Sequence, residues 1–349
     1  MRKPLLVSLM CISQDCKGNS FSLAGDESDL IEIINGTLKC NKCGASYKIE
    51  NGIVNFLGDM NKAISRERNA MDADDYIKDK DGNKYKINSE SIRKFSDVFL
   101  ALPEGDGSYF FKRGGSFQTI AEASDRFYST LDHLRLTGRE KILEIGASFS
   151  YASFKFAQKG CSVVATDISN YLKVSGLFVG EAYYDRMFSD MHNIPFVDNT
   201  FDMVFAAAVL HHSKNLKKVF SEIYRVLKPG GRLVLINETS RGVLERIHPV
   251  YKEMEEKGYG DTAYTLIEWN KAARGGGFKN ARVEFLSLAA DYVTRRRNRG
   301  AKVDFKLRLA YFLKRHQKLE RFLLWFTILP RMLTRPKSWR LICYKNAEN

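Results

Sequence analysis

The sequence predicts an α/β fold built on a doubly wound sheet whose strands are mostly parallel. Three observations between residues 141 and 238 support this prediction. Short apolar runs typical of buried strands alternate with amphipathic helical patterns. A glycine and several small residues follow the first run, and acidic residues follow later ones. The chain has 349 residues, 44% of them hydrophobic, which is enough for two domains or one enlarged domain.

The first apolar run covers residues 141–145 and ends at Gly146. Small residues and then a helical pattern over residues 151–157 follow, which predicts a strand, a tight turn and a helix. The next strand, residues 161–165, leads to Asp167, about twenty residues beyond the glycine. Because parallel strands end at one edge of a sheet, this spacing places a carboxylate where the ribose of a nucleoside cofactor would lie.

Further strands and helices continue the alternation. A third strand is expected near residues 184–188, and residues 199–212 are interpreted as a fourth strand with its exit. A helix with one apolar face begins near Leu216 and stops at the Lys-Pro-Gly-Gly sequence of residues 228–231. Residues 232–238 then form a fifth buried strand, so the strands and helices alternate as in a parallel sheet.

Two cysteine pairs mark the first unit, residues 1–58. Cys11 and Cys16 are separated by four residues, and Cys40 and Cys43 by two. Four thiolates on two short hairpins suit tetrahedral Zn²⁺, and Gly44 allows the tight turn behind the second pair. The alternative is that these are four ordinary thiols in a small β unit. A closed set of four thiolates would be structural, since it leaves zinc no open position.

Composition indicates a cytosolic protein. The apolar run near the N-terminus is too short for a signal peptide, and no window reaches the roughly eighteen apolar residues that a membrane span requires. In a reducing compartment the six cysteines are not expected to form disulfides. The net charge of +14 is concentrated in one segment, because residues 291–340 hold fifteen Lys or Arg and three acidic residues. Such a block indicates a partner surface.

Linked motifs carry a family resemblance. The segment from residue 141 to 238 resembles the class I S-adenosylmethionine-dependent methyltransferases, in particular the group that includes the ubiquinone and menaquinone enzymes. The motifs are Leu143-Glu-Ile-Gly146, Ile194-Pro-Phe196, Phe201-Asp202, Leu210-His-His212 and Arg225-Val-Leu-Lys-Pro-Gly-Gly231. The N-terminal segment resembles the zinc ribbons that precede many such domains. The resemblance implies a Rossmann-like, seven-stranded sheet, mostly parallel, with its last strand antiparallel.

The same resemblance implies a domain organisation. Residues 277–286 match the family's sixth strand and residues 339–344 its last strand, so the basic block is an insertion between them. Because strand six ends at the carboxyl edge of the sheet, the insertion emerges on the ligand-binding side. The expected units are a zinc ribbon (1–58), a linker with irregular helix (59–118), a methyltransferase core (119–290), a basic amphipathic insertion (291–337), and the last strand with the tail (338–349).

Cofactor-binding residues also follow from the resemblance. Glu144 would brace the cofactor loop or the amino-acid end of S-adenosylmethionine, and Gly146 would let the backbone approach it. Serines, Ser148 and Ser150, replace the family's next two glycines, and Ser148 could hydrogen-bond the methionine carboxylate. The alternative is a degenerate site that binds cofactor weakly or not at all. Asp167 would accept the ribose hydroxyls.

On the adenine side, the resemblance implies that Asp190 accepts the amino group, with the amide of Met191 nearby. Ala207, at the exit of the fourth strand, would leave room for the cofactor. Methyl transfer is an in-line displacement, so it needs alignment first and a general base only when the nucleophile carries a proton. His211 and His212 lie at the edge of the site as candidate bases, and a purely structural role is the alternative.

The basic insertion permits several readings. Its apolar residues recur at helical spacing between Leu319 and Leu333, and with Trp325 and the surrounding cations they suit a helix lying in a membrane surface over residues 295–333, or one holding a lipid-bearing substrate. Alternatives are contacts with RNA phosphates through Arg295–Arg299, and a lid helix packed on the core.

The expected function is S-adenosylmethionine-dependent methylation of a small-molecule, glycan or lipid-linked acceptor. The alternatives are an rRNA or tRNA methyltransferase and a degenerate, non-catalytic binding protein. The expected location is cytoplasmic, with peripheral contact at the inner face of the membrane.

Overall fold

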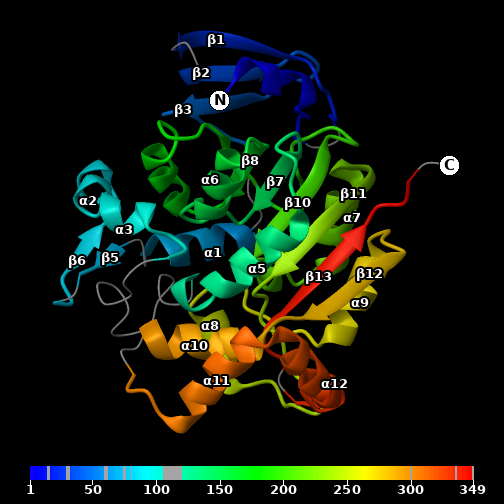
Figure 1. Ribbon diagram of the computed structural model, residues 1–349. Coiled ribbons are helices and arrows are strands. Elements are labelled where there is room, and N and C mark those ends of the chain that lie inside the picture. Colours follow the sequence, from blue (N-terminus) through cyan, green and yellow to red (C-terminus); the bar gives the residue numbers. More distant parts are fainter. Residues whose placement is uncertain are drawn as a thin grey trace.

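The computed structural model describes residues 1–13, 16–28, 32–58, 62–73, 76–79, 81–104, 120–298, 301–334 and 336–347. Within these residues, eleven strands form one sheet in the order β1-β2-β3-β4-β9-β8-β7-β10-β11-β13-β12, and a separate hairpin contains β5 and β6 (Figure 1). The chain therefore has a doubly wound α/β core, as the sequence predicts.

The strands of this core lie close to their predicted positions. They are β7 (Lys141–Ile145), β8 (Ser162–Asp167), β9 (Asp185–Phe188), β10 (Phe201–Ala207), β11 (Leu227–Ile236), β12 (Asn280–Phe285) and β13 (Trp339–Tyr344). Neighbours from β9 to β11 are parallel. Strand β13 is antiparallel to both β11 and β12, which confirms the predicted antiparallel last strand. Strand β10 pairs in parallel with both β7 and β11, so the carboxyl ends of these strands lie at the same edge of the sheet.

Helices cover both faces of the sheet because successive strand residues point to opposite sides. Leu143 and Val204 face a cluster that includes Val219 and Phe220 of α7 (Leu216–Val226) and Trp269 of α9 (Leu266–Gly275). The opposite cluster contains residues of α5 (Ser124–Leu134) and α6 (Tyr151–Gln158). The β strands are thus buried on both sides, which explains their nearly continuous apolar sequences.

The N-terminal unit continues the sheet. It contains η1 (Lys3–Ser8), β1 (Phe21–Ser28), β2 (Ile33–Cys40), β3 (Ser46–Glu50) and β4 (Ile53–Asn55). Strand β4 pairs in parallel with β9, so the sheet is larger than the seven strands expected, and the N-terminal β unit does not form a sheet of its own. Two ion pairs hold the junction, Glu32–Arg186 at 2.6 Å and Arg2–Asp185 at 2.7 Å.

The segment expected as linker, residues 59–118, contains short elements where it is described. These are α1 (Lys62–Ala73), β5 (Tyr76–Lys78), β6 (Lys84–Lys86), α2 (Ser89–Lys94) and α3 (Ser96–Leu100). Residues 74, 75 and 105–119, which include parts of the acidic and glycine-rich stretches of this segment, lie outside the described residues. Phe99 of α3 is fully buried, so this segment packs on the core.

The insertion between β12 and β13 is helical. It consists of α10 (Leu288–Asn298), α11 (Phe305–Arg315) and α12 (Gln317–Leu333), with Arg299 outside the described residues. The remaining elements are η2 (Asn170–Leu177), η3 (Leu210–His212) and α8 (Pro249–Glu256). Among the described residues, no helix combines the length and apolar character needed to cross a membrane.

Candidate active site and cysteine cluster

A cavity of about 730 Å³ opens at the carboxyl ends of β7, β8 and β10. This volume lies within the range of about 300–1,000 Å³ that is usual for ligand pockets. Every residue predicted to bind the cofactor or to act as a base lines this one cavity. These residues are Glu144, Gly146, Ser148, Asp167, Asp190, Met191, Ala207, His211 and His212.

Gly146, at the end of β7, has no room for a side chain. Its φ is +67°, in the left-handed region that favours glycine, and a Cβ there would lie 2.3 Å from a methyl group of Val209. The backbone of the β7 loop can therefore approach the loop after β10 closely only because residue 146 is glycine. This closeness shapes the floor of the cavity.

Ser148 and Ser150 adopt the backbone conformation that glycine accepts most easily. Their φ angles are +48° and +55°, both left-handed. The serines therefore preserve a glycine-type loop and accept some strain in doing so. Ser148 lines the cavity, whereas Ser150 is fully buried and its hydroxyl forms no aligned hydrogen bond with the described residues.

Glu144 braces the loop from below. Its carboxylate accepts hydrogen bonds from the backbone N–H of Ser153, at 2.8 Å, and from the Ser153 hydroxyl in the first turn of α6. Burial raises the pKa of Glu144 to about 8, although both hydrogen bonds oppose the shift. A cation bound in the cavity would lower the pKa of Glu144 and would in turn be stabilised by the charged carboxylate.

Asp167, at the end of β8, joins two loops. Its two oxygens accept the backbone N–H groups of Ser148 and Ser169, both at 2.7 Å. Burial raises the pKa of Asp167, and these N–H groups oppose the shift. Each carboxylate oxygen keeps a further lone pair, so the residue can still accept hydroxyl donors from the cavity.

Asp190 follows β9 and is paired with a residue that sequence reasoning missed. His192 donates its backbone N–H to Asp190 at 2.9 Å, and His192 Nδ1 lies 2.7 Å from the same oxygen. His192 Nε2 in turn lies 2.7 Å from the hydroxyl of Ser213. Met191, between the two, is half-buried and lines the cavity. The pair fixes Asp190 at the cavity wall.

The cavity is also lined by Ala207 and by a second residue missed from the sequence, Asn237. Asn237 follows β11 at φ +61°, and its buried Oδ1 forms no hydrogen bond with the described residues. A buried carbonyl oxygen without a donor is uncommon in native structures and fits a donor supplied by a ligand. Its signal in the sequence is a polar residue directly after an apolar strand.

His211 is held by Glu238. The backbone N–H groups of Val209, Leu210 and His211 all donate to the buried Glu238 carboxylate at 3.0 Å, and His211 Nδ1 lies 2.7 Å from Oε2. His211 Nε2 lies 3.6 Å from Asp261 Oδ1, beyond hydrogen-bond length. One ring nitrogen is thus oriented by a carboxylate, while the other faces Asp261 without forming a hydrogen bond.

His212 lies among carboxylates from distant segments. Its Nδ1 is 2.8 Å from Glu67 Oε1 of α1 and 3.1 Å from Asp261 Oδ1. Burial lowers the pKa of His212, but Glu67 and then Asp261 outweigh it, so the pKa is raised overall. The side-chain nitrogen and oxygen atoms of His211, His212 and Asp261 lie within 4.8 Å of one another, and the contacts of the histidines with carboxylates hold them together. No local sequence motif predicts that Glu67 and Asp261 lie beside His212.

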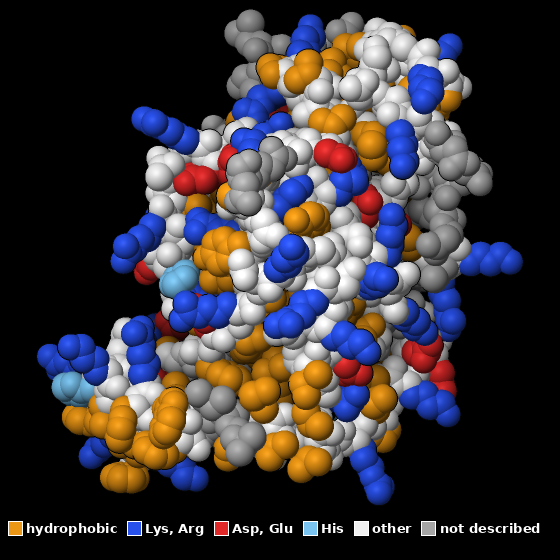
Figure 2. Space-filling view, turned by 90° about the vertical axis from the view of Figure 1, so that its right-hand side faces the viewer, with side chains coloured by type: hydrophobic (Ala, Val, Ile, Leu, Met, Phe, Trp, Pro, Cys, Tyr) orange, Lys and Arg blue, Asp and Glu red, His pale blue; other side chains and the backbone are white. Residues whose placement is uncertain are grey.

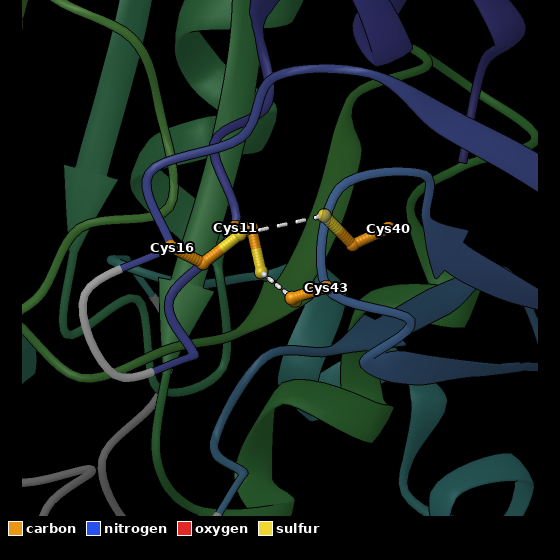
Figure 3. A group of neighbouring side chains, drawn as sticks. All are labelled: Cys11, Cys16, Cys40 and Cys43. Atoms are coloured by element: carbon orange, nitrogen blue, oxygen red, sulfur yellow. Dashed lines mark hydrogen bonds between the residues drawn. The ribbon is translucent and has the colours of Figure 1, made fainter.

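The four N-terminal cysteines converge from two loops (Figure 3). The sulfur atoms of Cys11 and Cys43 are 3.6 Å apart, those of Cys16 and Cys40 are 3.7 Å apart, and all four lie within 4.8 Å of one another. Four thiolates around tetrahedral zinc, with Zn–S bonds of about 2.3 Å, lie about 3.8 Å apart. Gly44, at φ +77°, makes the turn after the second pair. The donor set and spacing fit a closed zinc site.

Residues 143–235 match the family model described as a methyltransferase domain. This region forms a class I S-adenosylmethionine-dependent methyltransferase domain. Methyltransferase GfsG of Streptomyces halstedii is 30% identical over 139 residues, covering 38% of this chain and 50% of that protein. Demethylmenaquinone methyltransferase of Corynebacterium glutamicum is 32% identical over 124 residues, covering 36% and 52%. The chain thus spans about half the length of these curated relatives.

Among solved structures, this chain is similar in fold to phosphoethanolamine N-methyltransferase 2 of Haemonchus contortus in complex with S-adenosyl-L-methionine. The identity is 20% and the TM-score is 0.49, with 76% of this chain and 62% of that chain covered.

Proposed function

We propose that the protein transfers a methyl group from S-adenosylmethionine to a small-molecule, glycan or lipid-linked acceptor. The observation that carries this proposal is the convergence of all the predicted cofactor residues on one cavity at the carboxyl edge of the sheet. This edge is where ligands bind in open α/β sheets.

The residues present fit the cofactor. Gly146 gives the loop its close approach, and Glu144 supplies a buried carboxyl group whose charged form the ammonium group of the cofactor would favour. Asp167 would accept the ribose hydroxyls through its remaining lone pairs, and Asp190 the adenine amino group. The cofactor, when bound, supplies an electrophilic methyl group on a sulfonium. The buried Oδ1 of Asn237 would accept a hydrogen bond from a donor group on the cofactor or on the methyl acceptor.

On the acceptor side, we propose His211 as the group that removes a proton from a hydroxyl nucleophile. Glu238 orients Nδ1, and Nε2 is directed away from that pair. Such a carboxylate–histidine pair fixes the ring and stabilises the cation that forms when Nε2 takes the proton. His212 is engaged with Glu67 and Asp261, so it serves to position the wall rather than to act as the base.

The test uses labelled S-adenosylmethionine and a bacterial extract separated into lipid, soluble small-molecule, glycan and RNA fractions. We expect label in a non-RNA fraction with the wild type, and a loss of about a hundredfold or more with His211→Gln. His212→Gln is the matched control and should retain more activity. Label confined to RNA would contradict the proposed acceptor class, and equal loss with both histidine variants would contradict the assignment of the base.

We also propose that Cys11, Cys16, Cys40 and Cys43 bind one structural Zn²⁺. The sulfur spacing supports this, and so does the position of the cluster, which is connected to the core through β4 and β9. Zinc there would stabilise the N-terminal unit and take no part in the chemistry.

A further inference from the structure

Two of the three acidic side chains of the helical insertion, Asp291 and Glu320, face inward, and Asp304 is exposed. Asp291 and Glu320 are buried, and Asp291 pairs with Arg126 of α5 at 2.9 Å. Asp304, the third acid of the insertion, caps α11 and pairs with Arg296 at 2.8 Å. The acids are therefore used to anchor the helices, and the charge left facing solvent is positive.

The basic side chains of α11 and α12 remain exposed. Within the part of the chain that the structure describes, several of them form no ion pair: Lys306, Arg308, Arg315, Lys318 and Arg321. A group of cations that form no ion pair raises the local positive potential and attracts an anionic partner.

The same two helices expose an apolar stripe. Phe305 is 78% exposed and Trp325 is 67% exposed. The other exposed members are Leu309, Tyr311, Phe312, Leu319, Phe322, Leu323 and Phe326. Most of them recur every three or four residues, the spacing of a helix face that is normally buried. Figure 2 shows hydrophobic side chains over the lower part of this face, where α12 lies, with Lys and Arg around them.

The opposite side of the insertion holds it in place. Leu307 and Ala310 of α11 pack with Ala289 and Val293 of α10 in a small buried cluster. Glu320 of α12 accepts the backbone N–H of Ala289 at 2.9 Å. The exposed apolar stripe takes no part in these contacts, so its side chains face outward.

A loop beside the end of α12 extends the apolar surface. Val243 N–H donates to the Met332 carbonyl at 3.1 Å, and Leu244 N–H to the Leu333 carbonyl at 3.0 Å. The exposed apolar residues of this loop are Val243, Leu244 and Ile247. We define the lipid-facing surface as the exposed residues of 305–326 together with residues 243–247.

We propose that the lipid-facing surface binds the headgroup region of an anionic lipid bilayer. A second copy of this chain would bring the same unneutralised cations face to face, whereas anionic headgroups would neutralise them. Aromatic side chains, Trp325 above all, suit the boundary between headgroups and acyl chains. The surface is joined to the candidate active site through the chain, because the segment after residue 247 leads through α8 to Asp261 at the cavity.

Tryptophan fluorescence tests this proposal directly. Of the three tryptophans, Trp269 and Trp339 are 0% and 3% exposed, so Trp325 supplies the environment-sensitive signal. The probe is a vesicle of phosphatidylglycerol and phosphatidylcholine mixed with the full-length protein, without S-adenosylmethionine. We expect a blue shift on binding and quenching by brominated lipid, and Trp325→Phe should abolish both while the protein still sediments with the vesicles.

Matched variants separate the apolar and charged contributions. Phe322→Ser with Phe326→Ser should weaken binding by about a hundredfold or more, since two aromatic side chains no longer enter the bilayer. Lys306→Gln with Lys318→Gln should weaken it by roughly thirtyfold at low salt. The controls are Val7→Ser, an exposed apolar residue of η1, and Lys217→Gln with Lys279→Gln elsewhere on the surface, which should bind as the wild type does.

Three results would overturn the inference. The first is no binding to anionic vesicles. The second is binding to RNA, unaffected by the Phe322 and Phe326 substitutions, in a protein that does not bind vesicles. The third is a concentration-dependent dimer that the same substitutions dissociate. None of these measurements depends on methyl transfer, so the membrane inference and the proposed activity succeed or fail separately.

Discussion

Ser150→Gly should stabilise the protein, even though it removes a fully buried side chain. Ser150 has φ +55°, and the left-handed region costs a residue with a Cβ about 1–2 kcal/mol. Its buried hydroxyl lies beside that of Tyr184 but forms no aligned hydrogen bond with the described residues, so removing it costs little. Glycine relieves the strain but adds freedom to the unfolded chain, which costs about 0.5–1 kcal/mol. The net gain is expected to be about 0.5–1 kcal/mol.

Chemical denaturation followed by circular dichroism measures this free energy of unfolding. Ser150→Ala is the informative control, because it removes the hydroxyl and keeps the Cβ that causes the strain. Ser221→Gly, within α7, should instead lose about 0.5–1 kcal/mol, as glycine does inside a helix. If Ser150→Gly is no more stable than Ser150→Ala, the strained glycine-type loop is not a correct description of the cofactor loop.

Three further predictions concern the cysteine cluster, the junction between the N-terminal unit and the core, and the anchoring of the helical insertion. A strong chelator should lower the melting temperature by several degrees, as should Cys40→Ser, and metal analysis should find about one zinc per chain before treatment; a metal-free protein of equal stability would contradict the zinc site. Burial alone would raise the pKa of Glu32, but Arg186 and the N-terminal ammonium together outweigh it and hold the pKa below 4.5. Glu32→Gln should therefore cost about 2–3 kcal/mol at pH 7 and less as the pH falls below 4.5. A cost that does not change between pH 7 and pH 3 would refute this. Asp291→Asn should cost about 1–3 kcal/mol, because it leaves the partly buried Arg126 without its partner, and proteolysis between α10 and α11 should accelerate; unchanged cleavage would argue against Asp291 as the anchor.

The local part of the site could be predicted from the sequence. Gly146 and Asp167 each follow an apolar strand at a spacing that a parallel sheet converts into proximity, and both line the cavity. The cysteine pairs likewise occur at short range, and the structure brings all four sulfur atoms together. In each case the required geometry is encoded within a few residues of a strand or turn.

The rest depended on contacts between distant segments. Glu67 and Asp261 reach His212 from α1 and from the loop after α8, and neither belongs to a recurring motif. The continuation of the sheet through β4 depends on the pairing of Val54 with Met187, which alternation within a three-residue strand cannot specify. Long-range contacts of this kind are set by how whole elements pack.

Calorimetric titration of S-adenosylmethionine into the zinc-replete wild type and into Asp167→Asn tests whether this cavity binds the cofactor. We expect binding in the micromolar range for the wild type and a loss of at least about tenfold for the variant, because the amide cannot accept both ribose hydroxyls as a carboxylate does. Circular dichroism should show that the variant is folded. No binding by the wild type, or equal binding by a folded Asp167→Asn, would contradict the assignment of this cavity as the cofactor site.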